Sequence, residues 1–164
     1  MGLQLPGELI SLLGMLGYNW PEADETKLFQ LGGTWMDMAS TLHATVSDAD
    51  AVAQRIWSEN KGDDFDAFRT AWSGDEAPTR NLGDAANGCL MVGAGLMVCA
   101  GVVLALKINV IVQLTMLAIE IAQAIATAAP TFGASLAEIP IFKEITGAIV
   151  DELINQAIGA LLDG

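Results

Sequence analysis

Apolar residues recur at alternating spacings of three and four through much of the first half of the chain. The pattern holds for about four heptads, from Leu28 to Ile56, with Thr45 as its one polar member. This spacing places the apolar residues on one face of an α-helix that packs along a neighbouring helix. We therefore predict a first long helix over residues 20–60. Its helix-packing seam consists of Leu28, Leu31, Trp35, Met38, Leu42, Val52 and Ile56.

The segments that flank this helix are short. Residues 1–19 form an N-terminal lead, with a brief helix expected after Pro6. Pro21 suits the first position of the long helix, and the acidic residues that follow it compensate the helix dipole. Residues 63–74 are predicted as a second, short helix with one aromatic face, ending in the turn Trp72, Ser73 and Gly74. We expect Gly74 to end this helix in the left-handed conformation.

The second half of the chain is mostly apolar. Residues 79–129 are predicted as a helical region, in which nineteen residues from Gly88 to Leu106 carry no charge. As one helix this region would be about 75 Å long, so we expect a kink or break around Lys107–Asn109. Residues 141–162 are predicted as an amphipathic C-terminal helix. The fold class is therefore all-α, an elongated helical bundle with a long central apolar helix region.

The apolar segment 88–119 has two interpretations. Its length fits a membrane span, but a helix covered on all sides by other helices is also apolar all round. No basic cluster and no Trp or Tyr belt flanks residues 88–106, which favours the buried helix. We expect the helices over 28–56 and 142–161, or a second chain, to cover the segment. Lys107 is then expected to reach solvent or to pair with Glu120 or Glu144.

Charge and composition narrow the function classes. The chain has 20 acidic and 7 basic residues, which argues against nucleic-acid binding because phosphates need Lys and Arg. A single histidine, His43, excludes a multi-histidine metal site, and no nucleotide-binding or nucleophile motif is present, so we predict no enzyme and no cofactor. Cys89 and Cys99 would lie roughly 15 Å apart on one helix, too far for a disulfide. The first 17 residues lack the features of a secretory signal peptide.

Four stretches resemble a known family. Trp72-Ser73-Gly74 after an amphipathic helical region is similar to the WXG superfamily of small helical hairpins exported by type VII (ESX) secretion. Met1–Pro6, Asn19–Glu25 and Gln113–Ala122 resemble a narrower group, the N-terminal WXG-like domain of actinobacterial polymorphic toxins (CpnT-type), often labelled an outer-membrane-channel domain. The resemblance covers nearly all of residues 1–164, which we therefore interpret as one WXG-like domain.

The resemblance implies a secretion and docking module that packs helix against helix with partners. The expected partners are small WXG-type helical proteins and the type VII secretion machinery, with self-association as a further alternative. Secretion would then need no cleavable signal peptide. The family's export signal, Tyr-x-x-x-Asp/Glu, follows the hairpin, whereas the match Tyr18-x-x-x-Glu22 precedes it, so we expect the signal on a partner chain.

Two departures limit the resemblance. In small WXG proteins the Trp-x-Gly lies between two long helices, whereas here a short helix intervenes. No toxin domain follows in this sequence, so we expect a truncated or stand-alone domain. The alternative function is a membrane-inserting channel or translocation domain of the same toxin class, associated with the cell envelope and using residues 88–119.

Overall fold

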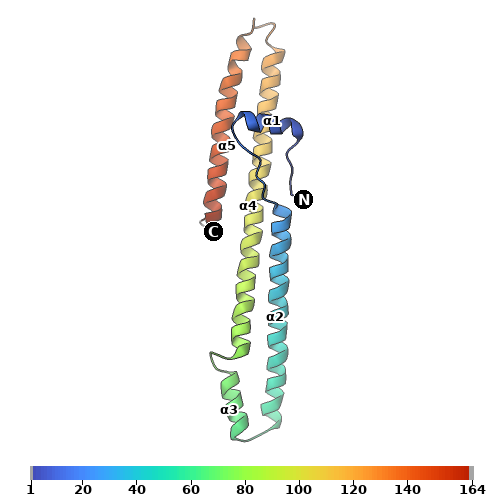
Figure 1. The fold of residues 1–164 in the computed structure, drawn as a ribbon, viewed down its shortest axis with the longest axis vertical. Helices are drawn as coiled ribbons and strands as arrows, with labels where there is room; N and C mark the ends of the chain where they lie inside the picture. Colours follow the sequence, from blue (N-terminus) through green and yellow to red (C-terminus); the bar gives the residue numbers. More distant parts are fainter. Residues whose placement is uncertain (1, 163–164) are drawn as a thin grey trace. The chain divides into compact units, whose positions relative to one another are not determined.

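The computed structural model describes residues 2–162, and the described chain is entirely α-helical apart from turns and connecting segments. Its elements are α1 (Gly7–Met15), α2 (Glu25–Glu59), α3 (Asp63–Trp72), α4 (Pro78–Ala126), the 3-10 helix η1 (Ala134–Glu138) and α5 (Ile139–Leu162), shown in Figure 1. No strand occurs within these residues. The predicted all-α class, with one long apolar helix, is confirmed.

The chain forms two compact units. Unit 1 contains the residues up to Lys27 together with those from Val98 onward, and unit 2 contains Leu28–Met97. Both α2 and α4 contribute to each unit.

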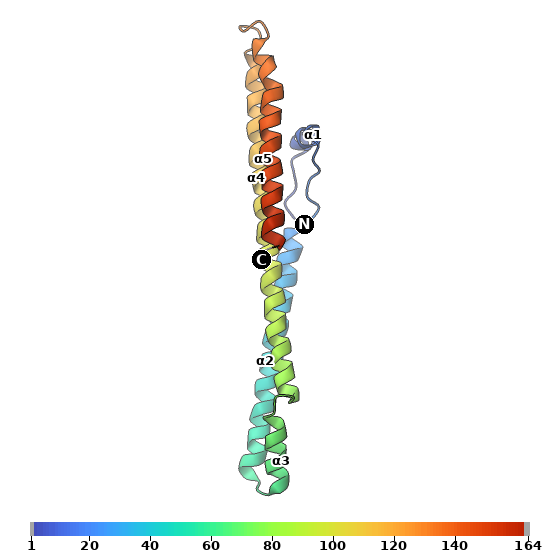
Figure 2. The same cartoon turned by 90° about the vertical axis from the view of Figure 1, so that its left-hand side faces the viewer.

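In unit 2 small residues lie where α2 and α4 approach each other most closely. Figures 1 and 2 show α2 beside the first part of α4, and the two helices are antiparallel. At the closest approach, a Cβ built on Gly32 would lie 2.9 Å from the Gly93 carbonyl oxygen, and a Cβ built on Gly93 would lie 2.9 Å from the Gly32 carbonyl oxygen. Ala39, Ala53 and Ala86 are buried along the same helices. Small side chains therefore let the two backbones approach closely.

The long first helix begins later than the pattern predicts. α2 starts at Glu25, so Pro21 is not its first residue. Asp24 caps the helix, because its Oδ1 accepts a hydrogen bond from the Lys27 backbone N–H at 3.1 Å, and this bond lowers the pKa of Asp24. Trp20 and Ala23 instead contact Lys107 of α4. These contacts hold residues 20–24 outside the helix.

Unit 1 packs α1 and the connecting segments onto the second part of α4 and onto α5. Its core consists of Leu5, Leu13, Val110 and Leu114. In Figure 1, α1 lies across the direction of α4 and α5. The turn before η1 uses two left-handed residues, Phe132 with φ 53° and Gly133 with φ 84°. Gly133 N–H donates to the Ala128 carbonyl oxygen at 2.7 Å, which closes this turn.

The predicted break near Lys107–Asn109 is wrong, because α4 is one continuous helix of 49 residues. At a rise of 1.5 Å per residue it is about 73 Å long. The prediction rested on length, because a single helix of about 75 Å was expected to be interrupted. The structure instead supplies Lys107 with partners where it stands, so the backbone continues without a break.

Lys107 is buried, with 2% of its surface exposed, and its pairing with Glu120 or Glu144 was wrongly predicted. Its Nζ donates to Glu25 Oε2 at 2.8 Å and to the Ala23 carbonyl oxygen at 2.6 Å, and lies 5.7 Å from the centroid of the Trp20 ring. Glu25 Oε1 also accepts a hydrogen bond from the Leu3 backbone N–H. Hydrogen bonding to both oxygens satisfies the buried carboxylate.

The N-terminal strap, which we define as residues 2–24, is held by these same groups. Trp20 Nε1 donates to the Leu3 carbonyl oxygen at 3.3 Å. A Cβ at Gly2 would lie 2.6 Å from Glu25 Oε2, so the strap fits closely against the ion pair. Leu5 and Leu13 of the strap cover Val110 and Leu114 of α4. One buried ion pair and one apolar cluster therefore fix the strap on α4.

The ion pair predicts how the stability of unit 1 depends on pH. The hydrogen bond from Lys107 lowers the pKa of Glu25 from 4.5 to about 2. A lowered folded-state pKa stabilises the fold above the unfolded-state pKa, and this contribution is lost as pH falls from about 4.5 towards 2. We expect the difference in unfolding free energy between wild type and Glu25→Gln, measured in urea, to shrink over this range by on the order of 2–3 kcal/mol. A difference that stays constant from pH 7 to pH 2.5 would contradict the assignment.

The apolar segment 88–119 is only partly covered by its own chain, so the expectation that neighbouring helices of this chain cover it is wrong. In the most apolar 18-residue window of α4, 22% of the residues are buried. The large apolar side chains of segment 88–119 that are exposed are Leu90, Met91, Val92, Val98, Ile108, Val112, Met116 and Ile119. Both α4 and the segment Ala134–Leu162 are long and apolar enough to cross a membrane, judged by length and composition alone. A second chain and a membrane remain as the alternatives that could cover this surface.

Candidate interaction site at the Trp-x-Gly turn

Trp72 joins α3 to α2. Its Nε1 donates a hydrogen bond to Asp50 Oδ1 at 2.7 Å. Its ring centroid lies 5.5 Å from that of Phe68, and Phe68 lies 5.8 Å from Trp57 of α2 in a second tilted pair. Such tilted aromatic pairs add to the stabilisation that burial provides. The turn is therefore anchored by one hydrogen bond and three packed rings.

Gly74 does not end α3 in the left-handed conformation, so this prediction is wrong. The last residue of α3 is Trp72, and Ser73 follows with helical angles, φ −90° and ψ 0°. Gly62, Gly17 and Gly133 are the described glycines with positive φ. A Cβ at Gly74 would lie 3.4 Å from the Ala71 carbonyl oxygen, at the edge of ordinary contact. The turn therefore relies on Trp72 rather than on the backbone freedom of Gly74.

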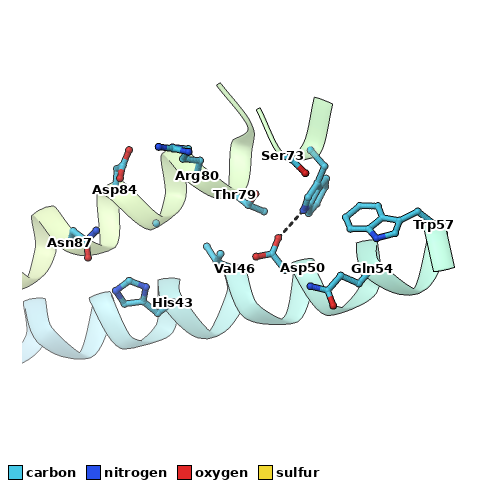
Figure 3. Close-up of a pocket in the computed structure, with 12 residues that line it drawn as sticks. His43, Val46, Asp50, Gln54, Trp57, Ser73, Thr79, Arg80, Asp84 and Asn87 are labelled. Atoms are coloured by element: carbon cyan, nitrogen blue, oxygen red, sulfur yellow. Dashed lines mark hydrogen bonds between the residues drawn. The ribbon is translucent and has the colours of Figure 1, made fainter. Parts of the chain in front are cut away.

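Two depressions flank Trp72. The polar cleft, of about 460 Å³, lies between α2, the end of α3 and the start of α4 and is drawn in Figure 3. Its lining is His43, Val46, Asp50, Gln54, Trp57, Trp72, Ser73, Thr79, Arg80, Gly83, Asp84 and Asn87. The apolar groove, of about 560 Å³, lies between α2 and α3 and is lined by Thr45, Asp48, Ala49, Val52, Ala53, Ile56, Phe68 and Trp72. Trp72 thus contributes to both.

The helix-packing seam does not coincide with the face that α2 turns towards α4. An inner seam of α2 faces α4 with its first part and α3 with its last part, where Asp50 contacts Trp72 and Trp57 contacts Phe68. It consists of Gly32, Met36, Ala39, His43, Val46, Asp50, Ala53 and Trp57. In the helix-packing seam Leu28 and Leu42 are half-buried, and the other members, Leu31, Trp35, Met38, Val52 and Ile56, are exposed. Val52 and Ile56 line the apolar groove beside Trp72. The seam therefore stays a prediction for packing with a helix from outside this chain.

Tyr18 and Glu22, the weak match to an export signal, lie in the N-terminal strap of unit 1. The Tyr18 hydroxyl donates to the Gly147 carbonyl oxygen at 3.2 Å, and its ring packs against the Leu13–Val110 core. Glu22 is exposed. The geometry gives Tyr18 a packing role, and a role in export remains a prediction.

Asp50 and Trp57 were not predicted as members of this site. A signal was present, because His43, Asp50 and Trp57 recur every seven residues and so share one face of α2. These polar and amphipathic residues sit on the inner face, where apolar residues alone would be expected. Among residues 2–162 no group of three or more potential metal ligands occurs. Cys89 is buried and Cys99 half-buried, and both are free thiols on α4.

Comparison with known proteins gives one match. Residues 4–149 match the family described as WXG100 like domain. No curated protein and no solved structure matches the chain. The family match spans most of the sequence, including α1, α2, α3, α4 and the first part of α5.

Proposed function

Because the chain belongs to the WXG100-like domain family, whose helical members are associated with type VII secretion, we propose that it is a docking module of a secreted bacterial toxin. It packs its exposed helix-packing seam against a helix of a small WXG-type partner, and the pair is exported together. Family members are typically non-enzymatic and leave the cell without a cleaved signal peptide. The narrower assignment to the CpnT-type toxins rests on the stretches Met1–Pro6, Asn19–Glu25 and Gln113–Ala122.

The observation that carries this proposal is the exposed helix-packing seam of α2. Large apolar side chains at 3-4 spacing match the surface that one long helix offers another. Leu31, Met38 and Val52 are 48%, 54% and 52% exposed, although they continue the pattern of a packed interface. Exposed apolar surface of this extent is typical of protein or membrane contact sites.

The test is complex formation with a small WXG-type helical protein. We expect Leu31→Glu combined with Met38→Glu to weaken the complex at least about 30-fold, since buried charges at two interface positions cost about 2 kcal/mol or more. The measurement is isothermal titration calorimetry with light scattering. Both residues are exposed in the free chain, so the fold should persist, as circular dichroism can verify.

The matched control places the same charges elsewhere on α2. Ser40→Glu combined with Ser47→Glu adds two carboxylates at exposed positions on the far side of the helix from the helix-packing seam. This control should bind like wild type. Equal binding by all three proteins would argue against docking through the seam.

Membrane insertion is the second candidate, favoured by the exposed apolar side chains of α4 and α5. In the most apolar windows of these two segments, 22% and 11% of the residues are buried. A protein that inserts should float with liposomes and release trapped dye without its partner. A monodisperse protein that does neither supports docking instead.

A further inference from the structure

In unit 1 the chain binds one of its own cations, the ammonium group of Lys107. The Lys107 ammonium is held by a carboxylate, a backbone carbonyl and the ring of Trp20. A carboxylate next to an aromatic face binds a cation through charge and through the ring quadrupole together. A carboxylate beside an indole ring is therefore a combination with which this chain binds a cation.

The polar cleft of unit 2 shares two of these components, a carboxylate and indole rings. Asp50 lies on α2 opposite the end of α3 and points into the cleft, as Figure 3 shows. Trp72 Nε1 donates to Asp50 Oδ1 and fixes the orientation of the carboxylate. An ionised carboxylate has about four acceptor positions, so the bond to Trp72 leaves acceptor capacity on Asp50.

The charge around the cleft favours a cation. Unit 2, residues 28–97, has ten acidic and four basic residues. Asp84 also lines the cleft. Arg80, the cationic side chain in the lining, pairs with Asp75 at 3.0 Å and is 60% exposed. The cleft therefore holds two carboxylates, Asp50 and Asp84, while its one arginine pairs with a residue outside the lining.

We propose that the polar cleft beside Trp72 binds a basic side chain, an arginine above all, that a docked partner chain presents between Asp50, Trp57 and Trp72. Arginine fits better than lysine because its planar guanidinium stacks on indole rings and is weakly hydrated. The inference rests on the proposed docking function, since the arginine comes from the partner. It adds a polar anchor at the Trp-x-Gly end of α2 to the apolar contacts of the helix-packing seam.

The experiment uses the full chain and two small probes. N-acetylarginine amide is titrated against ¹⁵N-labelled protein, and the indole Nε1–H signals are followed by NMR, with Trp72→Phe identifying the signal of Trp72. We expect a saturable shift of the Trp72 signal. N-acetylcitrulline amide has the same shape without the charge and should cause at least tenfold less shift at equal concentration.

Variants test the role of the carboxylate. Asp50→Asn keeps an acceptor for Trp72 Nε1 but removes the charge, and should weaken arginine binding at least tenfold. Asp37→Asn removes the same charge from an exposed position on α2 outside the cleft and should leave binding unchanged. Equal shifts with arginine and citrulline, or equal loss in both variants, would overturn the inference. The two probes are compared on the wild-type protein, so the test stands even if Asp50→Asn does not fold.

This result is separable from the docking proposal. The probes do not contact the helix-packing seam, so the Leu31→Glu, Met38→Glu variant should bind N-acetylarginine amide like wild type. If the protein does not bind N-acetylarginine amide but still forms its seam-dependent complex, the proposed arginine site is wrong and the docking proposal stands. A protein that binds arginine but forms no seam-dependent complex overturns docking and leaves the cation site.

Discussion

Replacing Lys107 by Met is expected to destabilise the protein by about 3–5 kcal/mol, because it leaves the Glu25 carboxylate buried without its cation. Met keeps an unbranched apolar stem of similar length and lacks the ammonium group, so the loss mainly reports the ion pair rather than a cavity. The strap contacts at Leu3 and Trp20 should loosen with it, since Glu25 holds the Leu3 backbone. The measurement is urea unfolding at pH 7, with hydrogen exchange of residues 3–16.

The control for this prediction is Lys27→Met, which removes the same charge in unit 1. Lys27 is 79% exposed and lies 4.0 Å from Asp24. Exposed pairs of this kind contribute about 0–1 kcal/mol, so the control should unfold nearly like wild type. If the two variants were equally stable, the buried pair would contribute no more than a surface charge.

Replacing Gly93 by Ala is expected to destabilise unit 2 by about 1–3 kcal/mol, although Ala favours helix by about 1 kcal/mol over Gly. The new Cβ would lie 2.9 Å from the Gly32 carbonyl oxygen, so α2 and α4 must move apart. A backbone oxygen cannot turn aside as a flexible side chain can. Thermal unfolding followed by circular dichroism measures the loss.

Gly95 provides a control of opposite sign. It lies in the same helix, and a Cβ there meets nothing within 4 Å. Gly95→Ala should therefore stabilise the protein by up to about 1 kcal/mol through helix propensity. If both substitutions shifted the melting temperature in the same direction, the close approach at Gly32 and Gly93 would not limit the packing of these helices.

The helices could be predicted because local signals mark them. The 3-4 periodicity predicted a helix through Leu28–Ile56, and the structure has α2 there. Boundaries were harder where distant residues decide them. Pro21 has the local features of a helix start, but the contacts of Trp20 and Ala23 with Lys107 hold that segment out of the helix.

The tertiary partner of Lys107 could not be predicted from the sequence. Glu25 lies 82 positions before Lys107, and nothing local selects it over Glu120 or Glu144, which are closer in sequence. The inner seam of α2 was missed for a different reason. The packing face was predicted from large apolar residues such as Leu31 and Met38. The helix backbones approach each other instead where the side chains are small, at Gly32 and Ala39. The smallest residues on the helix marked the interface within the chain.

The arrangement of the two units along the chain sets an order of events during synthesis. Unit 2 is a continuous segment, so its helices can pair as soon as residue 97 is available. Unit 1 is split around it, and its strap has no place to attach until Lys107 and Leu114 have been made. Closing so long a loop is slow compared with forming a local hairpin. The strap leaves the ribosome before the residues of α4 that it packs against, so it is expected to be among the last segments to fold, with its apolar residues accessible to chaperones in the interval.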